Sequence, residues 1–155
     1  EGERLDYIQD IPVPDLPLME RAKELGIKIS TELPCYGFYG VYIANKKEIL
    51  IASPEEIVFF HELSHAAYEF CIDKLKPSNN WIQEVIAELS AQALCHLVGK
   101  QPNNTLGNTY RYIENYAAEG GLKPVTACLN VIGDVERILN FILGKEVRSN
   151  VEHPI

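Results

Sequence analysis

The sequence predicts an α+β fold in which a small antiparallel sheet packs on a bundle of helices. Short runs with high β propensity lie between residues 27 and 52, and apolar residues at helical spacing fill the rest. This separation of strands from helices along the chain is typical of α+β domains. The 155 residues are enough for one domain with a single hydrophobic core.

The chain is predicted to divide into an arm at 1–18, a domain at 19–149 and a tail at 150–155. The arm contains three prolines and shows little periodicity, so we expect an extended segment on the surface. A short helix is expected over residues 18–25, ended by Gly26.

Three strands are predicted next, at 27–31, 37–44 and 48–52. The turn residues 45–47 join the second strand to the third, so a hairpin should lead directly into the following helix. That helix begins with a capping-box pattern, in which Ser53 is the N-cap, Pro54 is the first helical residue and Glu56 is the third.

Three further helices are predicted at 81–98, 108–119 and 124–144. Asn80 and Gly99 flank the first of them, as an N-cap and a stop signal. A glycine pair ends the second helix, and a proline opens the third.

Composition argues against two classes of protein. With 14 basic and 22 acidic residues the net charge is −8, and no basic run exceeds two residues, so nucleic-acid binding is not expected. No apolar stretch approaches the roughly 18 residues that span a bilayer, so membrane insertion is not expected either.

The cysteines predict a cytoplasmic location. They are widely spaced and form no C-x-x-C pair, so we expect reduced thiols at Cys35, Cys71, Cys95 and Cys128. Because the chain begins at Glu1 and not at Met, we also expect its amino end to have been trimmed.

The helix that follows the strands contains an H-E-x-x-H motif, formed by His61, Glu62 and His65. On an α-helix, positions i and i+4 share one face, so both imidazoles can bind one Zn²⁺ at roughly 2.0–2.1 Å. Glu62 can then act as general base on the water in the fourth position. The alternative is a pair of core histidines beside a solvated Glu62.

A catalytic zinc usually has three protein ligands, so a third donor is expected. Glu84 and Glu88 lie on one face of the helix predicted at 81–98. We assign Glu84 as the ligand and Glu88 as the carboxylate that holds the free N–H of a ligating histidine. The reverse assignment also fits the pattern, and a solvated acidic face is the plainer alternative.

Other polar residues are not assigned to the site. His96 lies about 18 Å along the helix from Glu84 at about 1.5 Å per residue, too far to share a metal. His153 falls in the tail. Tyr112 is a possible donor to an oxyanion, but a single tyrosine on a helix more often packs in the core.

The H-E-x-x-H motif with a downstream E-x-x-x-E resembles the gluzincin branch of zinc peptidases. The runs EILIA, FFHELSHAAYEF, EVIAELSAQALCHLVG, NTYRYIENY and DVERILNFILG are similar to the zincin-like C-terminal domain of ArdC-type antirestriction proteins, over roughly residues 36–144. A looser similarity links the chain to the ImmA/IrrE peptidases. The resemblance implies a zincin-like fold, Zn²⁺ and metallopeptidase chemistry. It does not extend to the single-stranded-DNA-binding domain of the ArdC family, so an antirestriction role does not follow.

We therefore expect a zinc metallopeptidase that acts on a peptide or protein substrate. One Zn²⁺ per chain would be held by His61, His65 and Glu84, with Glu62 as the catalytic base. The strand before the metal helix could receive an extended peptide by main-chain pairing. The alternatives are a non-catalytic partner-binding or antirestriction module that keeps the metal site, and a metal-stabilised domain without turnover. The sequence does not indicate the oligomeric state.

Overall fold

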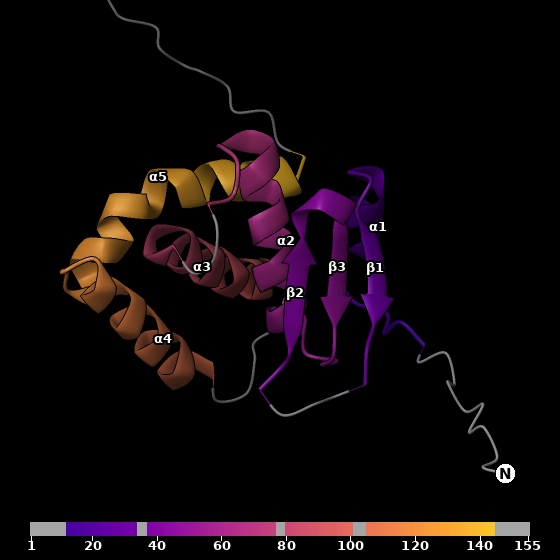
Figure 1. Ribbon diagram of the computed structural model, residues 1–155, viewed down its shortest axis with the longest axis horizontal. Coiled ribbons are helices and arrows are strands. Elements are labelled where there is room, and N and C mark those ends of the chain that lie inside the picture. The colour runs from indigo at the N-terminus through magenta and orange to yellow at the C-terminus, as the bar shows by residue number, and fades with distance from the viewer. Residues whose placement is uncertain (1–11, 34–36, 77–79, 101–104, 145–155) are drawn as a thin grey trace, which may run out of the picture.

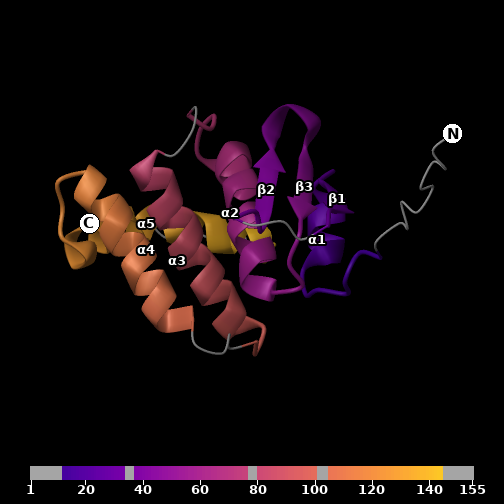
Figure 2. The same ribbon diagram turned by 60° about the horizontal axis from the view of Figure 1, so that its bottom comes forward.

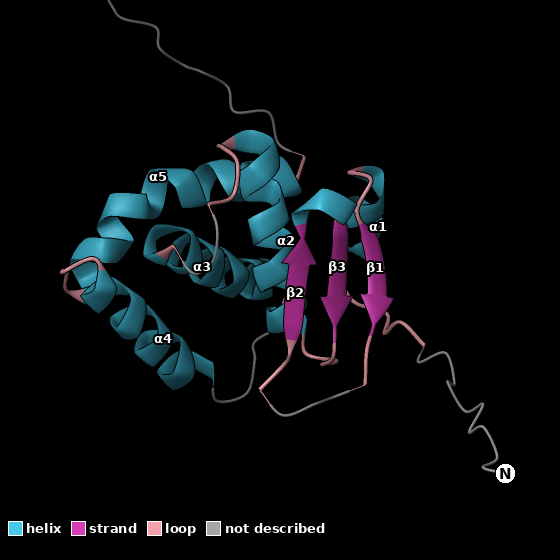
Figure 3. Ribbon diagram, in the orientation of Figure 1, coloured by secondary structure: helices cyan, strands magenta, loops and turns pink. Residues whose placement is uncertain are grey.

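The computed structural model describes residues 12–33, 37–76, 80–100 and 105–144. After one short helix the three strands come together and four helices follow, which confirms the predicted α+β class (Figures 1 and 3). The elements are α1 (Met19–Glu24), β1 (Lys28–Thr31), β2 (Gly40–Ile43), a 3-10 turn (Ala44–Lys46), β3 (Glu48–Ile51), α2 (Glu56–Cys71), α3 (Trp81–Leu97), α4 (Thr105–Glu119) and α5 (Pro124–Ile142).

The three strands lie in the order β1-β3-β2. The predicted hairpin is present, since β2 pairs antiparallel with β3, but β1 pairs parallel with β3, so the expectation of a wholly antiparallel sheet is wrong. Burial explains why β3 takes the centre. Its residues Ile49 and Ile51 are fully buried, and a strand with such side chains is best placed between two neighbours.

The helix α2 begins later than the capping-box pattern predicts. Glu55 is its N-cap and makes no side-chain capping bond. The hydroxyl of Ser53 instead accepts a hydrogen bond from the N–H of Glu55 at 3.2 Å. Serine often forms such a local turn in place of a helix cap, and here the turn holds the chain between β3 and α2.

The helices α3 and α4 differ in how clearly the sequence marks their ends. Asn80 caps α3 as predicted, by accepting a hydrogen bond from the N–H of Gln83, and Gly99 ends it with a φ of 72°. The helix α4 begins at Thr105, three residues before the predicted start. Gly107 lies in its first turn, and glycine weakens the helical pattern there.

The helix α2 lies between the sheet and the helices α3, α4 and α5 (Figures 1 and 2). One side of α2 covers β2 and β3, and the other packs on α3, which also contacts α4 and α5. Because α3 is surrounded in this way, it is buried on most of its circumference. The α2–α3 contact is the place where two helices bring their polar residues together inside the domain.

Part of the predicted arm belongs to the core, because Leu16 is buried with the side chains of the domain. Residues 1–11, the predicted tail with His153, and Cys35 lie outside the described residues. Cys71, Cys95 and Cys128 are free thiols. No helix in the described ranges combines the length and apolar character needed to cross a membrane.

Candidate metal site

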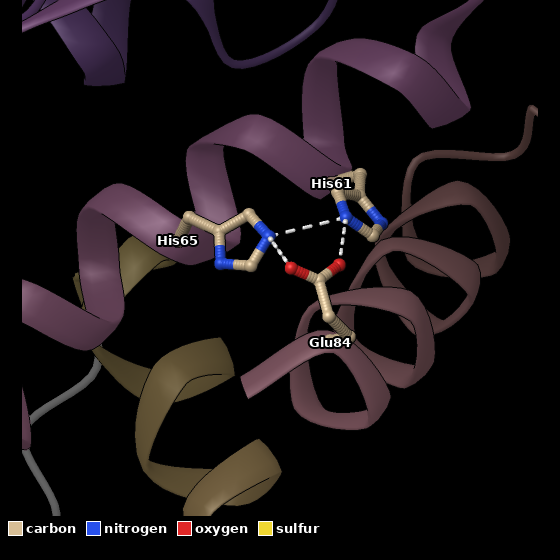
Figure 4. A group of neighbouring side chains, drawn as sticks. All are labelled: His61, His65 and Glu84. Atoms are coloured by element: carbon tan, nitrogen blue, oxygen red, sulfur yellow. Dashed lines mark hydrogen bonds and ion pairs between the residues drawn. The ribbon is translucent and has the colours of Figure 1, made fainter. Parts of the chain in front are cut away.

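His61 and His65 lie one turn apart on α2 and face Glu84 of α3 (Figure 4). The two Nε2 atoms are 3.2 Å apart. The carboxylate oxygens of Glu84 lie 3.4 Å from Nε2 of His61 and 3.6 Å from Nε2 of His65. All three side chains are only 13–14% exposed, so their polar atoms converge in a largely buried place.

These separations match those of ligands around one metal ion. Tetrahedral zinc with bonds of roughly 2.0–2.1 Å places its ligand atoms about 3.3–3.4 Å apart. The observed values of 3.2, 3.4 and 3.6 Å surround that figure. Within the described ranges, this is the one group of at least three His, Cys, Asp or Glu side chains that could hold a metal ion.

The carboxylates of the cluster favour a positive charge at the position that they share with the histidines. Burial lowers the pKa of His61, but contacts with Glu84 and Glu88 outweigh this effect and raise the pKa to about 10. Burial raises the pKa of Glu84, but the contacts with the two histidines lower it by more. The pKa of Glu84 therefore lies well below its ordinary value. A proton on His61 therefore balances the carboxylates, and a metal cation would supply the same balance.

Glu88 contacts the opposite side of the His61 ring. Its Oε2 lies 3.1 Å from Nδ1 of His61, whereas Glu84 faces Nε2. A ligating histidine usually has this kind of carboxylate on its second nitrogen. The geometry therefore favours Glu84 as ligand and Glu88 as support over the reverse assignment.

Tyr112 of α4 belongs to the site, although the sequence analysis did not assign it. Its hydroxyl donates to Oε2 of Glu84 at 2.6 Å, and its ring meets that of His61 edge-on at 5.7 Å. Burial and the neighbouring Glu84 raise the pKa of Tyr112 above its ordinary value, so the hydroxyl remains a donor. Its partner Glu84 is a ligand candidate, and the run NTYRYIENY, which contains Tyr112, is the sequence signal that could have assigned it.

A cavity of about 540 Å³ opens beside the cluster. It is lined by residues of the loop before β2, of the start of β2, of α2 and of α4, among them His61, Glu62 and Tyr112, and by Glu88 of α3. Glu62 lines this cavity and makes no hydrogen bond or ion pair with any other described residue. His96 lies exposed at the far end of α3 and takes no part in the cluster.

Comparisons of the chain with protein-family models, curated proteins and solved structures found no match.

Proposed function

We propose that the protein is a zinc-dependent metallopeptidase that hydrolyses a bond in a peptide or protein substrate. The observation that carries the proposal is the convergence of His61, His65 and Glu84, with separations of 3.2–3.6 Å, beside a cavity that His61 lines. Two imidazoles and one carboxylate are the donor set of several catalytic zinc sites, which keep a fourth position open. The resemblance of the sequence motifs to ArdC-type and ImmA/IrrE domains implies the same chemistry.

Bound zinc would polarise the substrate carbonyl and make water a nucleophile near neutral pH. Glu62 follows His61 on α2 and lines the cavity. It would take a proton during attack and pass it to the leaving amine. Because no described residue binds its carboxylate, Glu62 keeps its acceptor capacity for this task.

The strand β2 offers a place for an extended substrate. The strand directly before α2 is β3, which is paired on both sides, so the expectation that it receives a peptide is wrong. The strand β2 lies at one edge of the sheet, and Gly40 at its start lines the cavity. A peptide added along such an edge is held by main-chain hydrogen bonds. A substrate bound in this way would run past Glu62 towards the metal cluster.

Substitution of Glu62 by glutamine tests the proposal. The zinc-loaded protein should cleave members of a proteome-derived peptide library, with products identified by mass spectrometry. Glu62→Gln should retain zinc but lose cleavage, because the amide cannot accept the proton. Glu55→Gln is the matched control, since Glu55 is an exposed carboxylate lining the same cavity, and it should remain active.

Cleavage at the wild-type rate in Glu62→Gln would reject the mechanism. If the wild-type protein binds zinc but cleaves nothing in the library, the peptidase proposal fails and a partner-binding module with a structural metal takes its place.

A further inference from the structure

A chain of hydrogen bonds runs from the interior of the bundle to the metal cluster and links three helices. The amide Nε2 of Gln92 on α3 lies 2.5 Å from Oγ1 of Thr109 on α4. That hydroxyl lies 2.5 Å from Oε1 of Glu88, whose Oε2 lies 3.1 Å from Nδ1 of His61. Gln92, Thr109 and Glu88 are each 8% exposed, so the chain is largely buried, although Glu88 and Thr109 line the cavity beside the cluster.

The chemistry of Gln92 gives this chain a direction. An amide NH₂ can only donate, so Thr109 accepts from it and directs its single hydroxyl hydrogen to Glu88. A carboxylate can only accept, so Glu88 accepts a second hydrogen bond from Nδ1–H of His61. When a metal ion takes the place of the second proton of His61, this arrangement leaves the lone pair on Nε2, the nitrogen that faces His65 and Glu84.

The alternative orientation of the amide breaks the chain. A carbonyl oxygen of Gln92 facing Thr109 would compete with Glu88 for the one hydroxyl hydrogen. Glu88 would then lose a donor in a buried position, which is costly for a carboxylate.

We propose that Thr109, oriented by Gln92, is a positioning residue for the metal site. It holds Glu88, and through Glu88 it fixes the ring and the tautomer of His61 so that Nε2 is presented to the ion. The inference rests on the metal site of the proposed function and deepens it, since it assigns to α4 a part in metal retention. The H-E-x-x-H and E-x-x-x-E patterns carry no signal for it, because Thr109 lies outside them.

The test separates the hydroxyl of Thr109 from its methyl group. Thr109→Val keeps the shape and removes the donor, whereas Thr109→Ser keeps the donor and removes the methyl group. Zinc affinity is measured by competition with a chromophoric chelator, and thermal unfolding is followed on the metal-free protein. A visible spectrum of the Co²⁺-loaded protein reports the geometry of the ligands.

Thr109→Val should bind zinc about 10- to 100-fold more weakly and change the Co²⁺ spectrum, as loss of a residue that supports a ligand typically does. Thr109→Ser should bind zinc within a few-fold of wild type, even where the lost methyl group lowers its unfolding temperature. Thr126→Val is the matched control, because Thr126 is exposed on α5 away from the site, and it should bind as wild type.

Wild-type affinity in Thr109→Val, or equal weakening in the Val and Ser variants, would overturn the positioning role while leaving the proposed function standing. Failure of the wild-type protein to bind zinc would overturn both.

Discussion

The two sides of the metal cluster differ in how their polar groups are held. On the α3 and α4 side, Glu84 contacts both histidines and Tyr112, and Glu88 contacts His61 and Thr109. On the β2 side, Glu62 has no bonding partner among the described residues, and the side chain of Tyr39 is 66% exposed. We call the first the closed side, because hydrogen bonds hold its polar groups even though Glu88, Thr109 and Tyr112 also line the cavity, and we call the second, with Glu62, the open side.

This difference separates the residues that bind the metal ion from the residue that takes part in catalysis. Donors fixed by buried neighbours keep their geometry, which favours tight binding of the ion. A carboxylate that must take up and release a proton needs an acceptor site that no neighbour fills. The closed side should therefore govern metal retention, and the open side should govern turnover.

Removal of both histidines should have the largest effect on the closed side. A His61→Ala/His65→Ala variant should fall from about one zinc per chain to near zero in metal analysis after purification without chelators, because one carboxylate cannot hold the ion alone. Added zinc should raise the unfolding temperature of the wild-type protein but not of this variant, since only a bound ligand stabilises the native state.

His96→Ala provides the control, because His96 lies on α3 outside the cluster and should leave the zinc content unchanged. Zinc retained in full by the double variant would show that another group binds the metal and would remove the basis of the comparison.

The two glutamates should differ in how much each contributes to zinc affinity. Glu84→Ala removes a ligand and should weaken zinc binding more than Glu88→Ala, which removes a support and should cost about 10- to 100-fold. Competition with a chromophoric chelator measures both constants under one condition. If Glu88→Ala loses zinc more readily, the two carboxylates have exchanged roles.

The sequence predicted the α2 face well because its chemistry is local. Helical spacing alone brings His61 and His65 together, and the distance along α3 is enough to select Glu84 and Glu88 as a pair. Which of the two glutamates faces Nε2 depends on how α3 is rotated against α2, and that is set by tertiary packing. The parts played by Thr109 and Tyr112 depend on the approach of α4, which neither spacing nor capping in the sequence predicts.

For the fold as well, the sequence predicts local features better than tertiary packing. Element types and most helix ends follow from turns, caps and periodicity, as at Asn80 and Gly99. The parallel pairing of β1 with β3 does not, because strand order depends on which strand the core buries most deeply. The start of α2 was misplaced because Ser53 has two competing uses, as a cap and as a turn.

The smallest expected effect concerns the fit of β2 against α2 on the open side. A Cβ added at Gly40 would lie 2.8 Å from Cγ1 of Val58 and 3.2 Å from Cγ of Glu62, so β2 or α2 must shift. Val58 is β-branched and stiff within a helix, so it gives way poorly. Gly40→Ala should therefore lower the free energy of unfolding by about 1–3 kcal/mol, as overpacking does, and should slow turnover by displacing Glu62. Zinc affinity should stay close to that of the wild type, because the closed side is untouched.

Gly133→Ala makes the same chemical change where space is open. No atom lies within 4 Å of a Cβ built at Gly133, which is on the exposed part of α5. Alanine should stabilise that helix by about 0.5–1 kcal/mol relative to glycine. Urea denaturation of the metal-free variants should therefore give shifts of opposite sign. A Gly40→Ala protein as stable and as active as the wild type would show that β2 moves away from α2 without cost, and that the open side does not depend on this close contact.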